Sequence, residues 1–263
     1  MVHFVGAGSG AADLITVRGQ RLLSEADVVI YAGSTINKEL LNYCKKNVTL
    51  YDSAYLTLEE VMNIIKEADD KGLDIVRLHS GDPSVYGAVR EQIDELCKLN
   101  IEYDITPGVT AAMAAAASLG LEFTLPGVTQ SFVITRMSGR TEVPEAESIE
   151  RFVKTGASVA VYLSSTLTEE LADRLLSAGI SGDMPVAVVY KASWEDEKRL
   201  ACTLGTLTED MQREGINGLA VILLGHAVAQ LDCRSSYERS KLYDPSFATG
   251  YRGGDESTGD IGA

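Results

Sequence analysis

The segment Val2-His-Phe-Val-Gly6, followed directly by Ala7-Gly-Ser-Gly-Ala11, decides the fold. The first five residues form a short, β-prone run that is closed by a glycine, which predicts a strand. Apolar residues over 12–26 then recur near helical spacing, which predicts a helix with Asp13 as its candidate cap. A glycine-rich turn between a strand and a helix offers bare backbone and helix N–H groups to a ligand.

Strands and helices go on alternating along the first half of the chain. Further strands are expected over residues 27–31, 47–51, 74–78 and 101–105, with helices over 58–71 and 84–99. Because crossover helices join strands that run in the same direction, this alternation predicts a mainly parallel sheet. An Ala-rich helix over residues 111–117 leads to Pro126-Gly127, where the pattern pauses.

The second half of the chain predicts a second, mixed sheet. Strands are expected over residues 131–135, 158–163, 185–190, 199–204 and 219–224, with helices over 145–154, 168–178 and 205–213. The short turn around residues 194–198 predicts a hairpin, and a hairpin makes neighbouring strands antiparallel. We therefore expect two α/β domains, 1–112 and 129–233, a linker region over 113–128, and a polar, mobile tail over 234–263.

The composition is that of a globular protein, and the charge and hydropathy argue against nucleic acid and membranes as partners. The 263 residues are 45% hydrophobic and 23% charged, which is ordinary for a folded domain. The 23 Lys and Arg against 38 Asp and Glu give a formal net charge of −15, which argues against nucleic acid because phosphate backbones would be repelled. The apolar run over residues 219–231 is shorter than the roughly 20 residues that span a bilayer, so we expect no membrane contact.

Cysteine and histidine positions argue against a bound metal. No Cys-x-x-Cys pair is present, and the residues of both types are scattered: Cys44, Cys97, Cys202, Cys233, His3, His79 and His226. Ligands of a structural metal normally lie only a few residues apart, so no metal site is expected. Unpaired thiols and a start without a signal-like segment predict a cytoplasmic protein.

Two more glycine-containing loops follow predicted strands. They are Ser80-Gly-Asp-Pro-Ser-Val-Tyr-Gly87 and Thr106-Pro-Gly-Val-Thr-Ala-Ala112. The carboxyl ends of parallel strands meet at one edge of a sheet, where such folds bind ligands, so three glycine loops are expected to gather there. Asp82 is explained equally well as the cap of the following helix or as a carboxylate that faces a ribose or a cationic ligand.

The first glycine loop also satisfies the loose Gly-x-Gly-x-x-Gly/Ala pattern of nicotinamide-binding folds. That pattern needs an acidic residue at the end of the second strand, to hold the ribose hydroxyls. Here the strand ends with Ile30-Tyr-Ala-Gly33, and Asp27 stands at its beginning. A nicotinamide-dependent oxidoreductase is therefore kept only as an alternative.

Arginine residues are the candidate contacts for an anionic ligand in so acidic a chain. They form three groupings: Arg18 with Arg21, Arg90 alone, and Arg136 with Arg140. The planar fork of arginine suits carboxylates, although solvated charges paired with nearby acids explain such residues equally well. His79, beside the second loop, is either a hydrogen-bonded core residue or a base.

Five segments of the chain match a known family in order: Val5-Gly-Ala-Gly-Ser-Gly10, Asp13-Leu-Ile-Thr-Val-Arg-Gly19, Ala26-Asp-Val-Val-Ile-Tyr31, Ser80-Gly-Asp-Pro83 and Thr106-Pro-Gly-Val-Thr-Ala111. With them the chain resembles the tetrapyrrole methylases. These are two-domain enzymes that methylate corrin and sirohaem precursors with S-adenosylmethionine. One branch, which methylates precorrin-4 or cobalt-precorrin-4 at carbon C-11 in vitamin B12 synthesis, is most similar over three segments: His79–Gly87, Leu125–Gln130 and Thr135–Arg140. The uroporphyrinogen branch has an arginine where this chain has Ala88, which argues against that substrate.

The resemblance implies two α/β domains with S-adenosylmethionine bound in the cleft between them. The residues that match the family's cofactor contacts are Ser9, Ser80, Gly81, Asp82, Val85, Thr110 and Ala111 from the first domain, and Leu163 and Ala192 from the second. Many members have proline where this chain has Ser9, so a stiff turn is replaced by a softer one. The tetrapyrrole carries acetate and propionate arms, for which Arg136 and Arg140, and then Arg90, are the expected contacts. A homodimer is also implied.

The expected reaction is an in-line displacement, in which alignment of donor and acceptor supplies most of the acceleration. No general base is assigned, and Tyr86, Glu91 and His79 are the candidates. The alternatives are a methylase for another carbon of precorrins or of sirohaem precursors, the oxidoreductase, and a non-catalytic protein that binds S-adenosylmethionine or a tetrapyrrole. Whether the substrate already carries cobalt is left open by the sequence.

Overall fold

The computed structural model describes residues 1–232 and 237–253, which group into two compact units. The first unit holds Met1–Ser118 together with Val189–Arg199, and the second holds Leu119–Val188 and the chain from Leu200 onward. The sequence predicts Ala192 in the second domain, whereas the structure groups it with the first unit. The segment around it packs with the first unit, through contacts that are far apart in sequence.

The first sheet is parallel throughout, as the alternation of strands and helices predicts. Its strands are β1 (Val2–Gly6), β2 (Val28–Tyr31), β3 (Thr49–Asp52), β4 (Ile75–His79) and β5 (Tyr103–Thr106), in the order β3-β2-β4-β1-β5. β1 lies between β4 and β5, with Gly6 in register with His79 and Val5 with Thr106. The carboxyl ends of these three neighbouring strands therefore lie at one edge.

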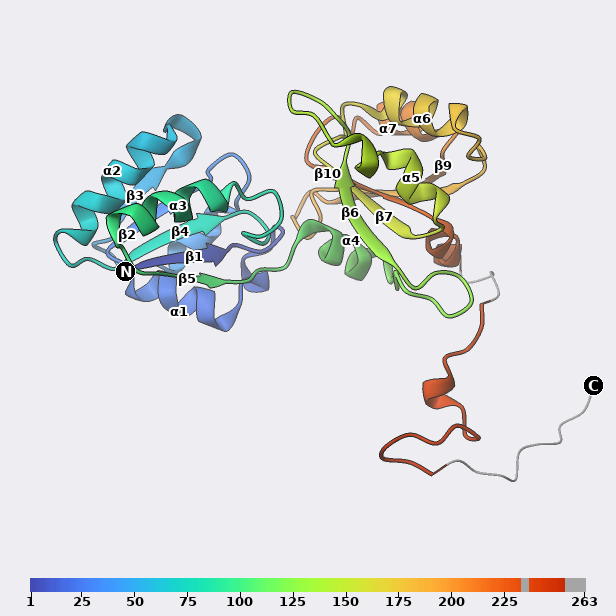
Figure 1. Cartoon of the computed structure of the whole chain (residues 1–263), viewed down its shortest axis with the longest axis horizontal. Helices are drawn as coiled ribbons and strands as arrows, with labels where there is room; N and C mark the ends of the chain where they lie inside the picture. The colour runs from blue at the N-terminus through green and yellow to red at the C-terminus, as the bar shows by residue number, and fades with distance from the viewer. Residues whose placement is uncertain (233–236, 254–263) are drawn as a thin grey trace, which may run out of the picture. The chain divides into compact units, whose positions relative to one another are not determined.

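Helices cover both faces of this sheet (Figure 1). α1 (Val17–Glu25) lies on one face, and α2 (Leu58–Asp69) and α3 (Val89–Leu99) lie on the other. Consecutive side chains of a strand point to opposite faces, so Phe4 packs with α2 and α3 while Val5 packs with α1. One central strand thus supplies apolar residues to two cores.

The start of α1 differs from the expectation. The helix begins at Val17 and not at residue 12, because Thr16 caps it: Thr16 Oγ1 accepts a hydrogen bond from Gly19 N at 3.0 Å. Asp13, the cap expected from the sequence, lies instead in a short 3-10 helix, η1 (Ala12–Leu14). The polar residue directly before the helical turn therefore provides the cap.

The start of α3 also differs from the expectation. The helix begins at Val89, whereas the sequence predicts residue 84. Tyr86 and Ala88, with φ angles of 53° and 48°, adopt the left-handed backbone conformation, which interrupts a right-handed helix. Residues 80–88 thus remain a loop.

The second sheet is mixed, as the sequence predicts. Its strands are β6 (Phe132–Arg136), β7 (Ser158–Tyr162), β8 (Pro185–Tyr190), β9 (Lys198–Thr203) and β10 (Ala220–Leu224), in the order β6-β7-β10-β8-β9. β6 runs parallel to β7, whereas β10 runs antiparallel to β7. β8 and β9 are neighbours joined by the short turn 191–197, which agrees with the expected hairpin.

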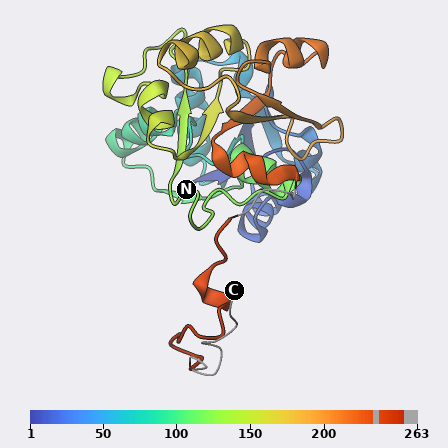
Figure 2. The ribbon, with the colours of Figure 1, turned by 90° about the vertical axis from the view of Figure 1, so that its right-hand side faces the viewer.

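Three helices lie together on one side of the second sheet: α5 (Ile149–Lys154), α6 (Thr168–Ser177) and α7 (Leu207–Arg213) (Figure 1 and Figure 2). α4 (Ala111–Leu119) ends at the boundary between the two units. The remaining elements are the 3-10 helices η2 (Lys38–Tyr43), η3 (Ser53–Tyr55), η4 (Glu145–Glu147) and η5 (His226–Asp232).

The tail expected over residues 234–263 is described only over residues 237–253. This stretch carries one short 3-10 helix, η6 (Lys241–Tyr243), and its residues are almost all exposed. Cys233, residues 234–236 and residues 254–263 lie outside the described residues. In the described part of the chain, Cys44, Cys97 and Cys202 are free thiols, and no helix is both long and apolar enough to cross a bilayer.

Candidate functional site

Three glycine-containing loops meet at the carboxyl edge of the first sheet. They follow β1 (residues 6–11), β4 (residues 80–88) and β5 (residues 106–111), and we name them together the glycine-loop cluster. Gly8 and Gly81 form an antiparallel bridge, in which Gly81 N donates to Gly8 O at 2.8 Å and Gly8 N donates to Gly81 O at 3.2 Å. The expected gathering of these loops is therefore observed as backbone contact.

Glycine is required where the three loops touch. A Cβ atom on Gly108 would lie 2.1 Å from the carbonyl oxygen of Gly81, and one on Gly6 would lie 2.6 Å from Gly108 Cα. Gly81 itself has a φ of 61°, a left-handed conformation that side chains disfavour. The loops therefore approach one another as bare backbone.

The cluster occupies the position at which open α/β sheets bind ligands. The chain leaves β1 toward α1 on one face of the sheet and leaves β4 toward α3 on the other face (Figure 1). Because β1 and β4 are neighbours, their connections diverge at this edge, and such a point of divergence is the usual ligand-binding position of these folds.

The Asp82 carboxylate ties two loops of the cluster together. Its Oδ1 accepts hydrogen bonds from Ser84 N and Ser84 Oγ, and its Oδ2 accepts one from Gly108 N at 2.8 Å. Burial alone would raise the pKa of Asp82, but the hydrogen bonds from Ser84 and Gly108 outweigh it, so that pKa lies below its usual value. α3 begins only at Val89, and Asp82 is therefore not its cap.

Eight of the nine sequence-predicted cofactor residues lie in the first unit: Ser9, Ser80, Gly81, Asp82, Val85, Thr110, Ala111 and Ala192. Ser80 Oγ donates to Thr35 O at 3.3 Å, and Ala111 begins α4. The ninth, Leu163, follows β7 in the second unit, where it is 71% exposed with a φ of 54°.

His79 and Thr106 place buried polar atoms at the ends of β4 and β5. His79 is 4% exposed, and neither its Nε2 nor Thr106 Oγ1 has a hydrogen-bond partner within residues 1–232 and 237–253. Burial, with a smaller contribution from the Arg77 guanidinium, lowers the pKa of His79 to about 3. An imidazole that holds a proton so weakly is a poor proton acceptor, which does not support the base role considered for His79.

A contact that the sequence did not predict fixes the first glycine loop. Trp194 Nε1 donates to Ser9 O at 3.0 Å, and Ser193 Oγ accepts from Ala11 N at 3.1 Å. A Cβ atom on Gly10 would lie 2.2 Å from Trp194 Cδ1, so the indole packs directly on the loop backbone. The available sequence signal was that the chain's single tryptophan stands in a predicted hairpin turn.

The arginines expected to bind carboxylates lie in different settings. Arg90 is exposed on α3 and pairs with Asp94 one helical turn away. Arg136, at the end of β6, donates to three carbonyls of the loop that follows it: Met137 O at 3.3 Å, Thr141 O at 3.0 Å and Glu142 O at 2.9 Å. Arg140 is exposed in that same loop and has no hydrogen bond or ion pair with any described residue.

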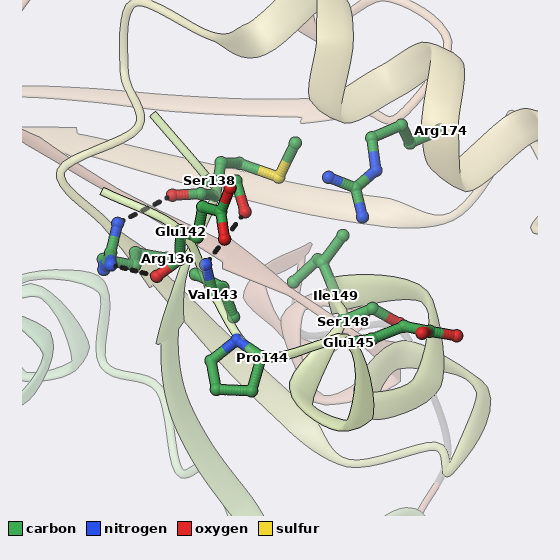
Figure 3. A pocket seen from close by; sticks show the side chains of 10 residues that line it. Arg136, Ser138, Glu142, Val143, Pro144, Glu145, Ser148, Ile149 and Arg174 are labelled. Carbon is green, nitrogen blue, oxygen red and sulfur yellow. Dashed lines mark hydrogen bonds between the residues drawn. The ribbon is translucent and has the colours of Figure 1, made fainter. Parts of the chain in front are cut away.

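A pocket of about 520 Å³ lies beside Arg136 in the second unit (Figure 3). Its lining comes from the end of β6 and the loop that follows it, from η4, from the start of α5, and from one residue in the second half of α6: Arg136, Met137, Ser138, Glu142, Val143, Pro144, Glu145, Ser148, Ile149 and Arg174. Figure 3 shows Arg136 and Arg174 at opposite sides of it. Arg174 Nε lies 2.6 Å from Glu150 Oε1, and this contact lowers the pKa of Glu150, so both guanidiniums already have partners.

Comparison with known sequences decides the family. A family model described as Tetrapyrrole (Corrin/Porphyrin) Methylases matches residues 1–208. The chain belongs to the tetrapyrrole methylases. This methylase is 45% identical over 251 residues to the cobalt-precorrin-4 C(11)-methyltransferase of Methanocaldococcus jannaschii, with 95% of each chain covered. It is 43% identical over 253 residues to the precorrin-4 C(11)-methyltransferase of a Sinorhizobium species, with 96% of this chain and 98% of that protein covered.

Solved structures share the fold of this tetrapyrrole methylase. The X-ray structure of a cobalt precorrin-4 methyltransferase, a cobalamin biosynthetic enzyme, matches with a TM-score of 0.84 at 41% identity, covering 86% of this chain and 95% of that one. A uroporphyrin-III C-methyl transferase from Thermus thermophilus, complexed with S-adenyl homocysteine, matches with a TM-score of 0.71 at 26% identity, covering 87% and 98%. The family and the α/β fold expected from the sequence are confirmed.

Proposed function

We propose that this tetrapyrrole methylase transfers a methyl group from S-adenosylmethionine to carbon C-11 of precorrin-4 or cobalt-precorrin-4, a step of vitamin B12 synthesis. The observation that carries the proposal is the match over 95% of the chain to a relative named for methylation at that carbon. The glycine-loop cluster supports it, because a backbone-lined edge of this kind suits a compound held by peptide groups.

The proposed S-adenosylmethionine contacts are the nine residues named above, with Gly81, Asp82 and Ala192 among them. Seven of them lie on the three loops of the glycine-loop cluster, which supports a shared site at this edge of the sheet. When bound, S-adenosylmethionine supplies an electrophilic methyl group on a positively charged sulfur. Backbone carbonyls can hold such a cation without a carboxylate that would stabilise the starting state.

The chain's own contribution is orientation rather than proton transfer. The Asp82 carboxylate is engaged by Ser84 and Gly108, and the pKa of His79, about 3, is too low for a base. Alignment of two reactants can supply roughly 7–11 kcal/mol of the barrier reduction, which a displacement reaction can use in full. Loops that touch at backbone distance and are cross-linked by Asp82 are suited to that task.

The proposed contacts for the substrate's carboxylate arms are Arg136, Arg140 and Arg90. Arg140 is the one whose guanidinium is exposed and has no partner among the described residues. Arg136 holds the carbonyls of residues 137, 141 and 142, so it orders the loop on which Arg140 lies. Arg90 would have to leave Asp94 before it could bind a substrate arm.

Binding of the spent cofactor tests the cofactor assignment. Titration of the purified chain with S-adenosylhomocysteine in a calorimeter should give saturable binding, with one site per chain. Absence of saturable binding at concentrations well above those used for other methylases would contradict the assignment.

A methylase for another ring carbon is the alternative within the same fold, and analysis of the product separates the two. That the chain works in the cytoplasm, and as a homodimer, stays a prediction.

A further inference from the structure

The turn between β8 and β9, residues 191–197, supplies hydrogen-bond partners to the backbone of the first glycine loop. Trp194 Nε1 donates to Ser9 O, and Ser193 Oγ accepts from Ala11 N and lies 2.9 Å from Ser9 Oγ. Two consecutive side chains of the turn therefore satisfy both a donor and an acceptor of the loop. Polar backbone groups without partners are costly when removed from water, so these contacts determine which loop conformation is stable.

The turn itself is held in a strained shape. Lys191 and Ser193 have φ angles of 47° and 68°, which place two non-glycine residues in the left-handed region. Each such residue costs roughly 1 kcal/mol or more, so the surrounding contacts must impose the conformation. Lys191 also pairs with Asp196, but that pair is at the surface and contributes little.

Glu197 is the residue that holds the turn. Its Oε2 accepts from Ser193 N at 2.7 Å, and its Oε1 accepts from Ser118 Oγ near the end of α4 and from Arg199 Nε at 2.8 Å. The side chain is 12% exposed. Burial alone would raise the pKa of Glu197, but the hydrogen bonds from Ser118 and Ser193 outweigh it, so that pKa lies below its usual value and the group is a carboxylate at neutral pH.

We propose that Glu197 is a positioning residue for the cofactor site: it fixes the turn in the shape in which Ser193 and Trp194 hold residues 9–11 of the first glycine loop. The inference rests on the proposed function, since the ligand of that loop is S-adenosylmethionine. Glu197 does not touch the loop itself and acts through Ser193. When it is removed, part of the cofactor's binding free energy must be spent on ordering the loop, so affinity falls.

The test compares Glu197→Ala, Glu197→Gln and the matched control Glu195→Ala, whose side chain is exposed on the same turn. Glu197→Ala should weaken S-adenosylhomocysteine binding roughly 10- to 100-fold, the loss expected for hydrogen bonds to a charged group. Glu197→Gln keeps one carbonyl oxygen for Ser193 N and should recover part of the affinity, while Glu195→Ala should bind as the wild type does. The KM for S-adenosylmethionine should rise with these losses while the KM for the tetrapyrrole stays unchanged.

Hydrogen exchange of the loop amides separates failure of this inference from failure of the proposed function. Without ligand, the amides of residues 8–11 should exchange faster in Glu197→Ala than in the wild type. Unchanged exchange and unchanged affinity in a folded Glu197→Ala protein would overturn the positioning role, as would equal rises in both KM values. A wild-type chain that does not bind S-adenosylhomocysteine would overturn the proposed function instead. If Glu197→Ala does not fold, Trp194→Phe, which loses only the indole N–H, should show the same loop exchange and a smaller loss of affinity.

Discussion

Asp82 Oδ2 accepts a hydrogen bond from Gly108 N at 2.8 Å, across two loops that follow different strands of the first sheet. The same carboxylate accepts from Ser84 N within its own loop. One side chain therefore sets the separation of the loops after β4 and β5, at the edge where this fold binds ligands. Asp82 therefore cross-links the two loops and is also a proposed contact of the cofactor.

Asp82→Asn should weaken both the site and the fold. An amide nitrogen in place of one carboxylate oxygen would face an N–H donor, so we expect a loss of about 1–3 kcal/mol in the free energy of unfolding and roughly 10- to 100-fold weaker S-adenosylhomocysteine binding. Urea denaturation and calorimetry measure the two effects. Asp70→Asn, an exposed carboxylate at the end of α2, is the control and should change neither. Wild-type affinity in Asp82→Asn would contradict the cross-link.

Gly108→Ala should destabilise the first unit because its Cβ would lie 2.1 Å from the carbonyl oxygen of Gly81. Relieving that overlap requires the loops to separate, and overpacking of this kind costs about 1–3 kcal/mol. The unfolding midpoint in urea should fall. S-adenosylhomocysteine binding should also weaken under conditions in which the variant is still folded. Gly218→Ala is the control, since a Cβ there meets no atom within 4 Å. Equal midpoints for the two variants would show that the contact is not as tight as described.

Arg136→Ala should change the stability of the fold, whereas Arg140→Ala should change the KM for the tetrapyrrole. Arg136→Ala removes three hydrogen bonds to carbonyls of its loop and should lower the free energy of unfolding by about 1–2 kcal/mol. Arg140→Ala removes an exposed side chain without a described partner, so stability should not change while the KM for the tetrapyrrole rises. An unchanged tetrapyrrole KM in Arg140→Ala would remove that residue from the substrate contacts. Denaturation curves and steady-state kinetics distinguish the cases.

His79 should make stability depend on pH. Its pKa falls from the ordinary 6.5 to about 3 on folding, so between these values the unfolded chain binds more protons than the folded one. Stability contributed by neutral His79 is therefore complete above about pH 6.5 and is lost as the pH falls toward 3, by about 2 kcal/mol at pH 5. The difference in unfolding free energy between pH 7.5 and pH 5 should be smaller in His79→Leu than in the wild type, in urea titrations. Identical differences would show that the pKa of His79 does not fall on folding.

The sequence was sufficient for features that depend on neighbouring residues. Glycines that directly follow predicted strands located all three loops of the cluster, because strand and turn signals are local. The parallel first sheet and the mixed second sheet followed from the same alternation. The predicted start of α3 failed, because the left-handed conformations of Tyr86 and Ala88 depend on how residues 80–88 pack, as the close contact between Gly87 and Pro83 illustrates.

Contacts between residues far apart in the chain could not be predicted. Trp194 donates a hydrogen bond to the carbonyl of Ser9, which lies 185 positions away in the sequence, and no local pattern predicts such a pair. For the same reason the sequence predicts Ala192 in the second domain, although it groups with the first unit. The hydrogen bonds from Arg136 to carbonyls of the loop that follows it depend on the path of that loop, which the sequence does not give; its proposed contact with an anionic ligand stays a prediction.

Methyl transfer to C-11 is tested most directly by incubating the purified chain with precorrin-4 or cobalt-precorrin-4 and S-adenosylmethionine labelled with carbon-13 in its methyl group. We expect one labelled methyl group in the product, bonded to C-11 in the carbon NMR spectrum, with one equivalent of S-adenosylhomocysteine released. Label at another ring carbon, or no label in a tetrapyrrole that demonstrably binds, would contradict the proposed reaction.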